Sequence, residues 1–140
     1  MQPHEIVRRF VDEYQTGADE RAFDEIIHPD VLDHSRPPGI ASGATGVRQQ
    51  FDGFRSAFPD FRATVLDQVS EGDKVVTRLL CRGEQIGDLP GIPATGNAME
   101  MTATVTHRIA DGKLVEKWSD KDVLRMLQQL GVIPPMGPPG

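Results

Sequence analysis

The spacing of apolar residues changes at Phe61, and this change limits the fold more than any other feature of the sequence. Before Phe61 apolar residues recur every three or four positions, which predicts amphipathic helices. After Phe61 apolar and polar residues alternate, which predicts half-buried strands. The helices are expected over residues 3–16, 19–28 and 45–58. The four substantial strands are expected over residues 61–70, 74–82, 99–109 and 113–118.

Two short turns predict that the strands pair as hairpins. Residues 71–73, Glu-Gly-Asp, separate the first two strands, and Asp111-Gly112 between the last two is the strongest hairpin signal in the chain. The break in alternation at Leu66 and Asp67 indicates a bulge or bend. With Asp111 and Gly112 as the two turn residues, the expected cross-strand pairs are Ala110–Lys113, Ile109–Leu114, His107–Glu116 and Val105–Trp118.

The remaining segments complete one domain over residues 1–133. A brief extended piece is expected at 31–34, a structured flap rich in Pro and Gly at 83–97, and a last helix at 120–130. The Pro/Gly-rich tail, 134–140, is expected to be disordered or to lie on a neighbouring molecule. Helices segregated from an antiparallel sheet define the α+β class, and a strongly curved sheet around helices leaves an apolar cavity.

Composition argues against several classes of protein. The net charge of −6 and the pI near 5.1 argue against binding to nucleic acid, which needs a basic surface. No apolar run approaches the ~20 residues that span a bilayer, and no glycine loop suits a nucleotide cofactor, so a cytoplasmic protein without a nucleotide is expected. The single cysteine, Cys81, follows two leucines and is expected to be a packed thiol.

The candidate chemistry is proton transfer by carboxylate and imidazole. Asp122 follows the last strand, where an apolar cavity would raise its basicity, although Ser119-x-x-Asp122 also fits a helix capping box. His107 opposite Glu116 is either a functional pair or a buried, charge-satisfied one. His28, Asp30, Asp33 and His34 do not form a recognised metal site, and no metal is expected. Alternation places Asp33 and His34 on opposite faces, and His34 is the one expected at a pocket.

An ordered set of motifs resembles the SnoaL-like polyketide (ester) cyclases over nearly the whole chain apart from the tail. Each motif alone is weak, but their order is specific. They are His28-Pro29-Asp30 with His34, Ala57-Phe58-Pro59-Asp60, the segment 87–96 (GDLPGIPATG), the segment 107–118 (HRIADGKLVEKW), Asp122, and the segment 127–131 (LQQLG).

The resemblance implies a cone-shaped α+β barrel that closes a polyketide ester ring by intramolecular aldol condensation, without metal or cofactor. It further implies that Asp122, or Asp120 if the register slips, is the general acid/base, with His107 and His34 as hydrogen-bond donors to the enolate. A homodimer or homotetramer is the expected assembly. The side chains expected to contact a small hydrophobic, polyketide-type substrate are Tyr14, Phe51, Phe54, Phe58, Met99, Met101, Glu116 and Trp118.

Other reactions fit the same cavity. A dehydratase, an isomerase or an epoxide hydrolase uses the same kind of proton transfer, and a binding protein without activity uses the aromatic pocket alone. No nucleophile elbow and no Cys/His pairing is evident, so hydrolysis through a covalent intermediate is disfavoured.

Overall fold

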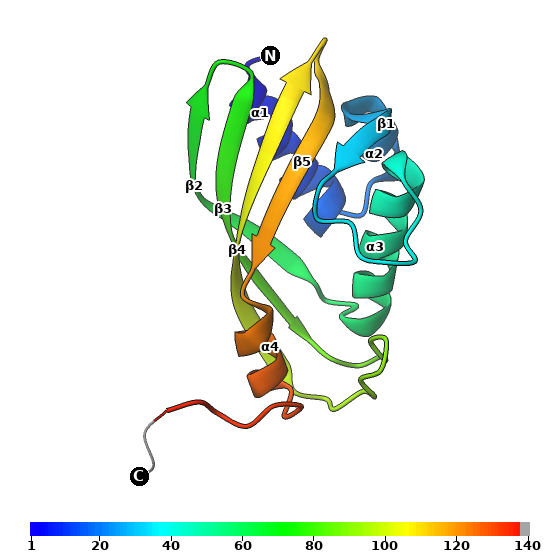
Figure 1. Ribbon diagram of the computed structural model, residues 1–140, viewed down its shortest axis with the longest axis vertical. Helices are drawn as coiled ribbons and strands as arrows, with labels where there is room; N and C mark the ends of the chain where they lie inside the picture. The colour runs from blue at the N-terminus through cyan, green and yellow to red at the C-terminus, as the bar shows by residue number, and fades with distance from the viewer. Residues whose placement is uncertain (138–140) are drawn as a thin grey trace.

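The computed structural model describes residues 1–137, and in it a curved five-stranded sheet lies against the helices (Figure 1). This arrangement confirms the predicted α+β class and the order of helices before strands. The elements are α1 (Pro3–Arg9), the π-helix η1 (Phe10–Thr16), α2 (Glu20–Ile26), β1 (Ile27–Asp33), α3 (Gly43–Ala57), β2 (Arg62–Glu71), β3 (Lys74–Glu84), β4 (Ala98–Ala110), β5 (Lys113–Lys121) and α4 (Val123–Gln129).

The sheet is mixed, with strand order β1-β5-β4-β3-β2. Strands β2 to β5 form the expected antiparallel meander, whereas β1 pairs parallel to β5. The prediction of a brief extended piece at 31–34 is therefore corrected. The segment belongs to a full strand that begins at Ile27, and α2 ends at Ile26. Pro29 is tolerated because β1 is an edge strand, where a missing N–H breaks no ladder.

The first helix changes its winding at Phe10, where α1 continues as the π-helix η1. The wider turn buries Gln15 together with Phe10, Val11 and Tyr14, so four of the seven residues face inward. Short π-helical turns of this kind are frequent at functional sites. Here the wide turn brings Gln15, a polar residue, to the inner side of the fold.

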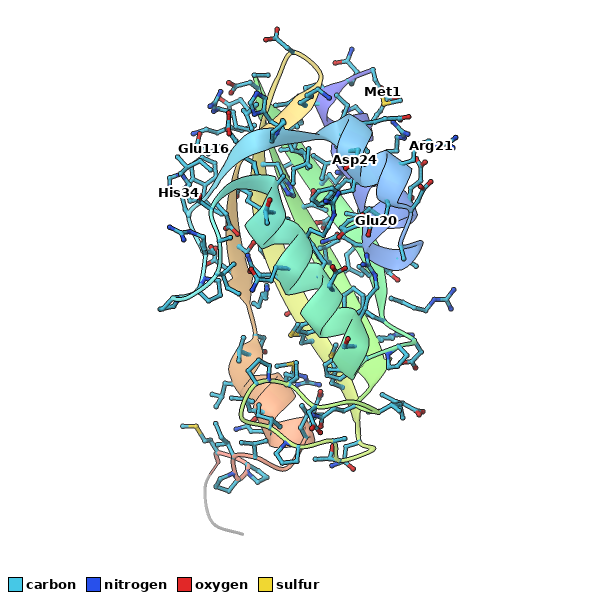
Figure 2. All side chains as sticks on the ribbon, turned by 90° about the vertical axis from the view of Figure 1, so that its right-hand side faces the viewer. Met1, Glu20, Arg21, Asp24, His34 and Glu116 are labelled. Carbon is cyan, nitrogen blue, oxygen red and sulfur yellow. The ribbon has the colours of Figure 1, made fainter. Side chains whose placement is uncertain are left out.

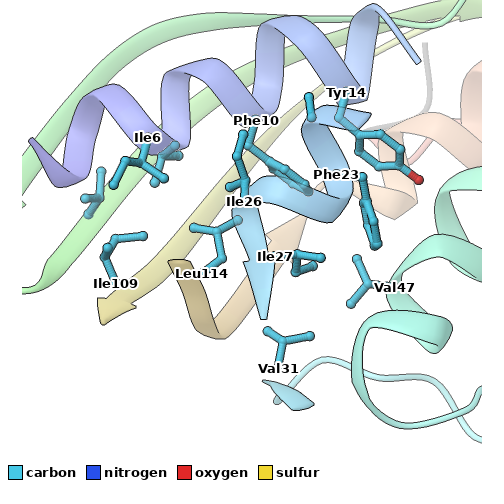
Figure 3. Close-up of a cluster of buried hydrophobic side chains, with 13 residues drawn as sticks. Ile6, Phe10, Tyr14, Phe23, Ile26, Ile27, Val31, Val47, Ile109 and Leu114 are labelled. Atoms are coloured by element: carbon cyan, nitrogen blue, oxygen red, sulfur yellow. The ribbon is translucent and has the colours of Figure 1, made fainter. Parts of the chain in front are cut away.

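Two clusters of buried side chains hold the helices to the sheet. One joins α1, η1, α2 and β1 to the hairpin end of β4 and β5, and Figure 3 shows Phe10, Tyr14 and Phe23 at its centre. The other joins α3 and α4 to the middle of β3 and β4. At about 1.5–3 kcal/mol for each large apolar side chain removed from water, these clusters provide most of the driving force for folding.

The β4–β5 hairpin has a bulge that sequence reasoning did not anticipate. Asp111 and Gly112 both have positive φ, as the predicted tight turn requires, and the pairs Ala110–Lys113 and Ile109–Leu114 are confirmed. Beyond them Arg108 pairs with Glu116, so Val115 is an extra residue in β5. A slip of one residue moves every later side chain to the other face, and the pairs predicted for His107 with Glu116 and Val105 with Trp118 are wrong. Their partners are Lys117 and Ser119.

The boundary between β5 and α4 also differs from the prediction. Strand β5 continues to Lys121, and Asp122 is the N-cap of α4, where its Oδ1 accepts a hydrogen bond from the Arg125 N–H at 3.2 Å. The capping box predicted from Ser119 is therefore wrong, because Ser119 is in the strand. The start of α3 shifts in the same way: its N-cap is Ser42, and Thr45 lies inside the helix.

The predicted bulge and flap are both confirmed. The β2–β3 ladder shifts its register between Val65 and Asp67. The flap between β3 and β4 is held by the fully buried Gln85, whose side chain donates to the Ile92 carbonyl and accepts from Thr95. Over the described part of the chain, no helix is both long enough and apolar enough to span a membrane.

Candidate functional site

An internal cavity lies between α3 and the concave face of the sheet. From α3 it is lined by Gln50, Phe51 and Phe54, and the end of η1 contributes Gln15. Its floor and walls on the sheet side are Phe61, Leu79, Cys81, Met101, Ala103, Val105, Lys117, Ser119 and Lys121. Apolar walls with a few convergent polar groups are typical of small-molecule sites. The cavity volume is about 60 Å³, so a ligand of several rings must displace lining side chains.

The polar side of the cavity belongs to the inner face of β5, which carries Lys117, Ser119 and Lys121. Lys117 is 8% exposed, yet its Nζ makes no hydrogen bond or ion pair within residues 1–137. The ammonium lies over the Phe51 ring, 5.5 Å from its centroid. Desolvation lowers the pKa of Lys117 to about 8, partly opposed by the negative charge of Asp33.

The two neighbours of Lys117 in the sheet are Asp33 on β1 and His107 on β4. Asp33 is half-buried and accepts hydrogen bonds from the Gln50 side chain at 3.1 Å and from the Ser35 N–H at 2.9 Å. Of the two residues that alternation separated, Asp33 therefore faces the interior and His34 faces away. This corrects the expectation that His34 would lie at the pocket.

His107 is buried and neutral. Its side chain occupies the next inward-facing position of β4 after Val105, which lines the cavity. The His107 ring contacts Phe10 edge-on, with 6.1 Å between ring centroids. Desolvation, together with the charge of Lys117, lowers the pKa of His107 to about 3. Its Nδ1 has no hydrogen-bond partner in the described part of the protein.

Three predicted site residues gather instead on the outer side of β5. The His34 imidazole lies parallel to Trp118 at 4.6 Å, and its Nε2 is 2.6 Å from Glu116 Oε2. Figure 2 shows His34 and Glu116 near each other at the left-hand edge of the molecule. Arg108 holds the other carboxylate oxygen of Glu116 at 2.8 Å, and both partners lower the pKa of Glu116, Arg108 more strongly. We define His34, Arg108, Glu116 and Trp118 as the outer cluster.

The two candidate acid/base residues lie where β5 leaves the cavity. Asp122 directly follows Lys121, the last cavity-lining residue, and its side chain is exposed apart from the cap it makes with Arg125. Asp120 lies in a surface groove formed by Ser35, Pro37, Gln50, Ser119, Asp120, Lys121 and Val123. Because Gln50, Ser119 and Lys121 line both spaces, the groove adjoins the cavity, and we infer that it is the entrance.

The predicted substrate contacts separate into three groups. Phe51, Phe54 and Met101 line the cavity, whereas Glu116 and Trp118 belong to the outer cluster. The third group is packed in the hydrophobic clusters and consists of Tyr14, Phe58 and Met99. Cys81 is a packed thiol, as predicted, and burial raises its pKa to about 11.

Sequence reasoning missed the polar residues of the cavity, namely Gln15, Gln50, Lys117, Ser119 and Lys121. An isolated lysine in a strand is ordinarily a surface residue, so its type gave no signal. A signal for Gln15 was available, since it directly follows the buried Tyr14, but a regular helix would turn it outward. No group of three His, Cys, Asp or Glu side chains within residues 1–137 is arranged to hold a metal ion.

An α+β fold whose curved sheet surrounds a cavity with few polar groups defines a class of small-molecule proteins. In this class the ligand site is the interior of the fold. Residues 5–130 match the family model of the SnoaL-like polyketide cyclases. The chain belongs to this family.

Two of its relatives are named as aklanonic acid methyl ester cyclases of Streptomyces. It is 27% identical over 135 residues to the aklanonic acid methyl ester cyclase DnrD of Streptomyces peucetius, which covers 91% of this chain and 89% of the relative. Among solved structures, TsrD of Streptomyces laurentii is 30% identical with a TM-score of 0.84, covering 93% of this chain and 95% of that one. IdmH of Streptomyces antibioticus is 34% identical with a TM-score of 0.82, covering 94% and 100%.

Proposed function

We propose that this protein is a cofactor-independent cyclase that closes a ring in a polyketide ester by intramolecular aldol condensation inside the cavity. The observation that carries the proposal is an interior cavity with aromatic walls and a polar strip on β5, in a chain of the SnoaL-like family. Exclusion of water strengthens each charge and dipole that faces the substrate. The ester substrate of the named relatives is the model for the reactant.

In the proposed reaction Asp122 takes a proton from the carbon next to the ester carbonyl, and this carbon then attacks a ketone carbonyl of the same molecule. The new carbon–carbon bond leaves an alkoxide, to which Asp122 returns the proton, so the product is an isomer of the substrate. What supports this role is the position of Asp122 directly after Lys121, the last residue of β5 that lines the cavity. The helix cap and the proton transfer use the same carboxylate at different oxygens, and only Oδ1 accepts from Arg125.

His107 does not reach the end of the cavity that lies near Asp122. Val105 and Ala103 occupy the inner positions of β4 between His107 and that end. His34 is separated from the cavity by the sheet. We therefore assign neither histidine to the proton transfer. The role of the neutral His107 is to influence the polarity of the surroundings of Lys117.

The test is turnover of aklanonic acid methyl ester by the purified protein, followed by mass spectrometry. A product of unchanged mass is expected. Loss of one water would replace the cyclase with a dehydratase, and an unchanged substrate at high enzyme concentration would remove the proposal for this class of ester.

A matched pair of variants identifies the acid/base residue. Asp122→Asn is expected to lower kcat by about 10²–10⁴-fold. The fold should be kept, because Asn caps a helix as well as Asp does. Asp120→Asn is the counterpart: if this variant loses activity and Asp122→Asn does not, the entrance groove and not the helix cap supplies the base.

We further propose that the protein forms a homodimer or homotetramer through the outer face of the sheet. Trp118 and the 68%-exposed Val69 leave apolar surface on β5 and β2. Light scattering is expected to give a mass of two or four chains, and the mass of one chain would contradict the assembly.

A further inference from the structure

Lys117 is the least expected residue of the cavity, because the proton transfer assigned to Asp122 makes no use of it. It is 8% exposed, and its ammonium has an aromatic ring on one side and open cavity on the other. Burial of an unpaired ammonium is unfavourable, and the negative charge of Asp33 offsets this only in part, because it forms no ion pair with Lys117. A charged group kept at this cost and aimed into a ligand cavity points to a ligand of opposite charge.

The position of Lys117 along β5 excludes it from the reacting carbon. From Lys117 to Asp122 the chain takes five steps, which is on the order of 16 Å in extended conformation. A carbon that gives its proton to Asp122 is too far away for its enolate oxygen to reach the inner end of the strand. Lys117 therefore faces a different part of the ligand, at the end that enters the cavity first.

The groups around Lys117 define the chemistry of that end. Gln15 Oε1 is buried in the cavity wall and accepts no hydrogen bond within the described residues. A hydroxyl group can donate to Gln15 and accept from Lys117, whereas a carboxylate cannot donate. The Phe51 ring below Lys117, together with Phe54 and Phe61, favours a flat aromatic or conjugated ring.

We propose that Lys117 is the specificity-determining residue of the cavity and binds the acidic hydroxyl of a phenol or enol at the end of the substrate remote from the ester. The hydroxyl donates to Gln15 while it is neutral, and the nearby ammonium makes its ionisation easier. The ligand class is a flat, elongated molecule with an acidic ring hydroxyl at its inner end and an enolisable ester at the entrance. The assignment of the ester end rests on the proposed cyclase reaction. Binding of the hydroxyl end does not.

The experiment uses 4-nitrophenol, a small flat probe whose phenolate has a visible absorbance that its neutral form lacks. Titration of the probe in the presence of excess protein measures the pKa of the bound hydroxyl. With the native protein this pKa is expected to fall by about one unit or more below that of the free probe, since a nearby cation favours the anion. In Lys117→Met it is expected to rise above the free value, because the apolar cavity then disfavours the charge.

Two further variants keep the test decisive. Lys74→Met removes the lysine that lies over Trp118 on the outer face, and it is expected to leave the pKa of the bound probe unchanged. Lys117→Arg retains a positive charge, so it is expected to keep a lowered pKa of the probe even if Lys117→Met folds poorly. Equal pKa values of the probe in the native protein and in Lys117→Met, or failure of the native protein to bind the probe at all, would overturn the proposal.

Turnover provides an independent readout. Lys117→Met is expected to raise KM at least tenfold while kcat changes little, because an interaction remote from the reacting carbon contributes equally to substrate and transition state. A loss confined to kcat would overturn the assignment. If the probe result holds and no ester is turned over, the hydroxyl site stands and the cyclase proposal fails. If the ester is turned over and the probe result fails, the assignment of Lys117 is rejected and the cyclase proposal stands.

Discussion

The two faces of β5 use similar residue types in opposite ways. On the outer face Glu116 is held by Arg108 and His34, and Trp118 lies against His34, so each charge of this cluster has a partner. On the inner face Lys117 has none within the described residues, and the neighbouring His107 is neutral. The comparison teaches that satisfied charges stabilise a surface, whereas unsatisfied ones mark the site where a ligand completes the set.

The largest expected effect is the fall in the free energy of unfolding at acidic pH that His107 causes. The unfolded chain protonates this histidine near its ordinary pKa of 6.5, whereas the native state resists protonation until about 3. Between these values the unfolded state binds more protons, so the free energy of unfolding falls as the pH falls, by at most about 1.4 kcal/mol per pH unit. His107→Gln is expected to lose this dependence in urea titrations between about pH 5 and pH 6.5.

The exposed His34 is the matched control for that measurement. His34→Gln on the outer face removes a histidine without changing the buried cluster, and the pH dependence attributed to His107 is expected to remain in this variant. If both variants behave alike, the burial of His107 does not determine its titration and the contrast between the two faces fails.

The second effect is a gain in stability. Because Lys117 is buried without an ion pair or hydrogen bond in the described part of the chain, Lys117→Met is expected to raise the free energy of unfolding at neutral pH by on the order of 1–3 kcal/mol. The folded pKa is about 8 and the ordinary value is 10.5, so the native protein gains stability as the pH rises between them. The advantage of the variant should therefore shrink over that interval in urea titrations.

The outer-face counterpart is Lys74→Met, which removes a lysine that lies 5.3 Å from the Trp118 ring centre. It is expected to change stability by at most about 1 kcal/mol and to lower it. A destabilised Lys117→Met would show that the inner lysine is a structural residue, and a stabilised Lys74→Met would remove the contrast between the two faces.

The smallest effect is expected from the outer cluster itself. His34→Ala removes the ring that lies on Trp118 but touches no cavity wall, so kcat and KM for the ester should stay within about twofold of the native values. Steady-state kinetics tests this directly. A large loss of kcat would restore His34 to the proton transfer and remove the functional distinction between the faces of β5.

Much of the fold could be predicted from local patterns. The Asp111-Gly112 turn and the change of period at Phe61 predicted the hairpins and the α+β order, because each depends on residues close together in the chain. The cavity wall formed by Phe51 and Phe54 was also among the predicted contacts. The spacing of apolar residues on a helix directly gives the face that it buries.

Local patterns in the sequence specified most of the elements, their order, and the position of Asp122 at the end of the last strand. Which side chains of β5 and β1 face the cavity depended on long-range strand pairing. The single extra residue at Val115 exchanged Glu116 for Lys117 on the inner face, and the parallel pairing of β1 with β5 brought Asp33 beside it. Alternation in a strand fixes two sets of side chains but not which set is inside, because a slip of one residue exchanges them.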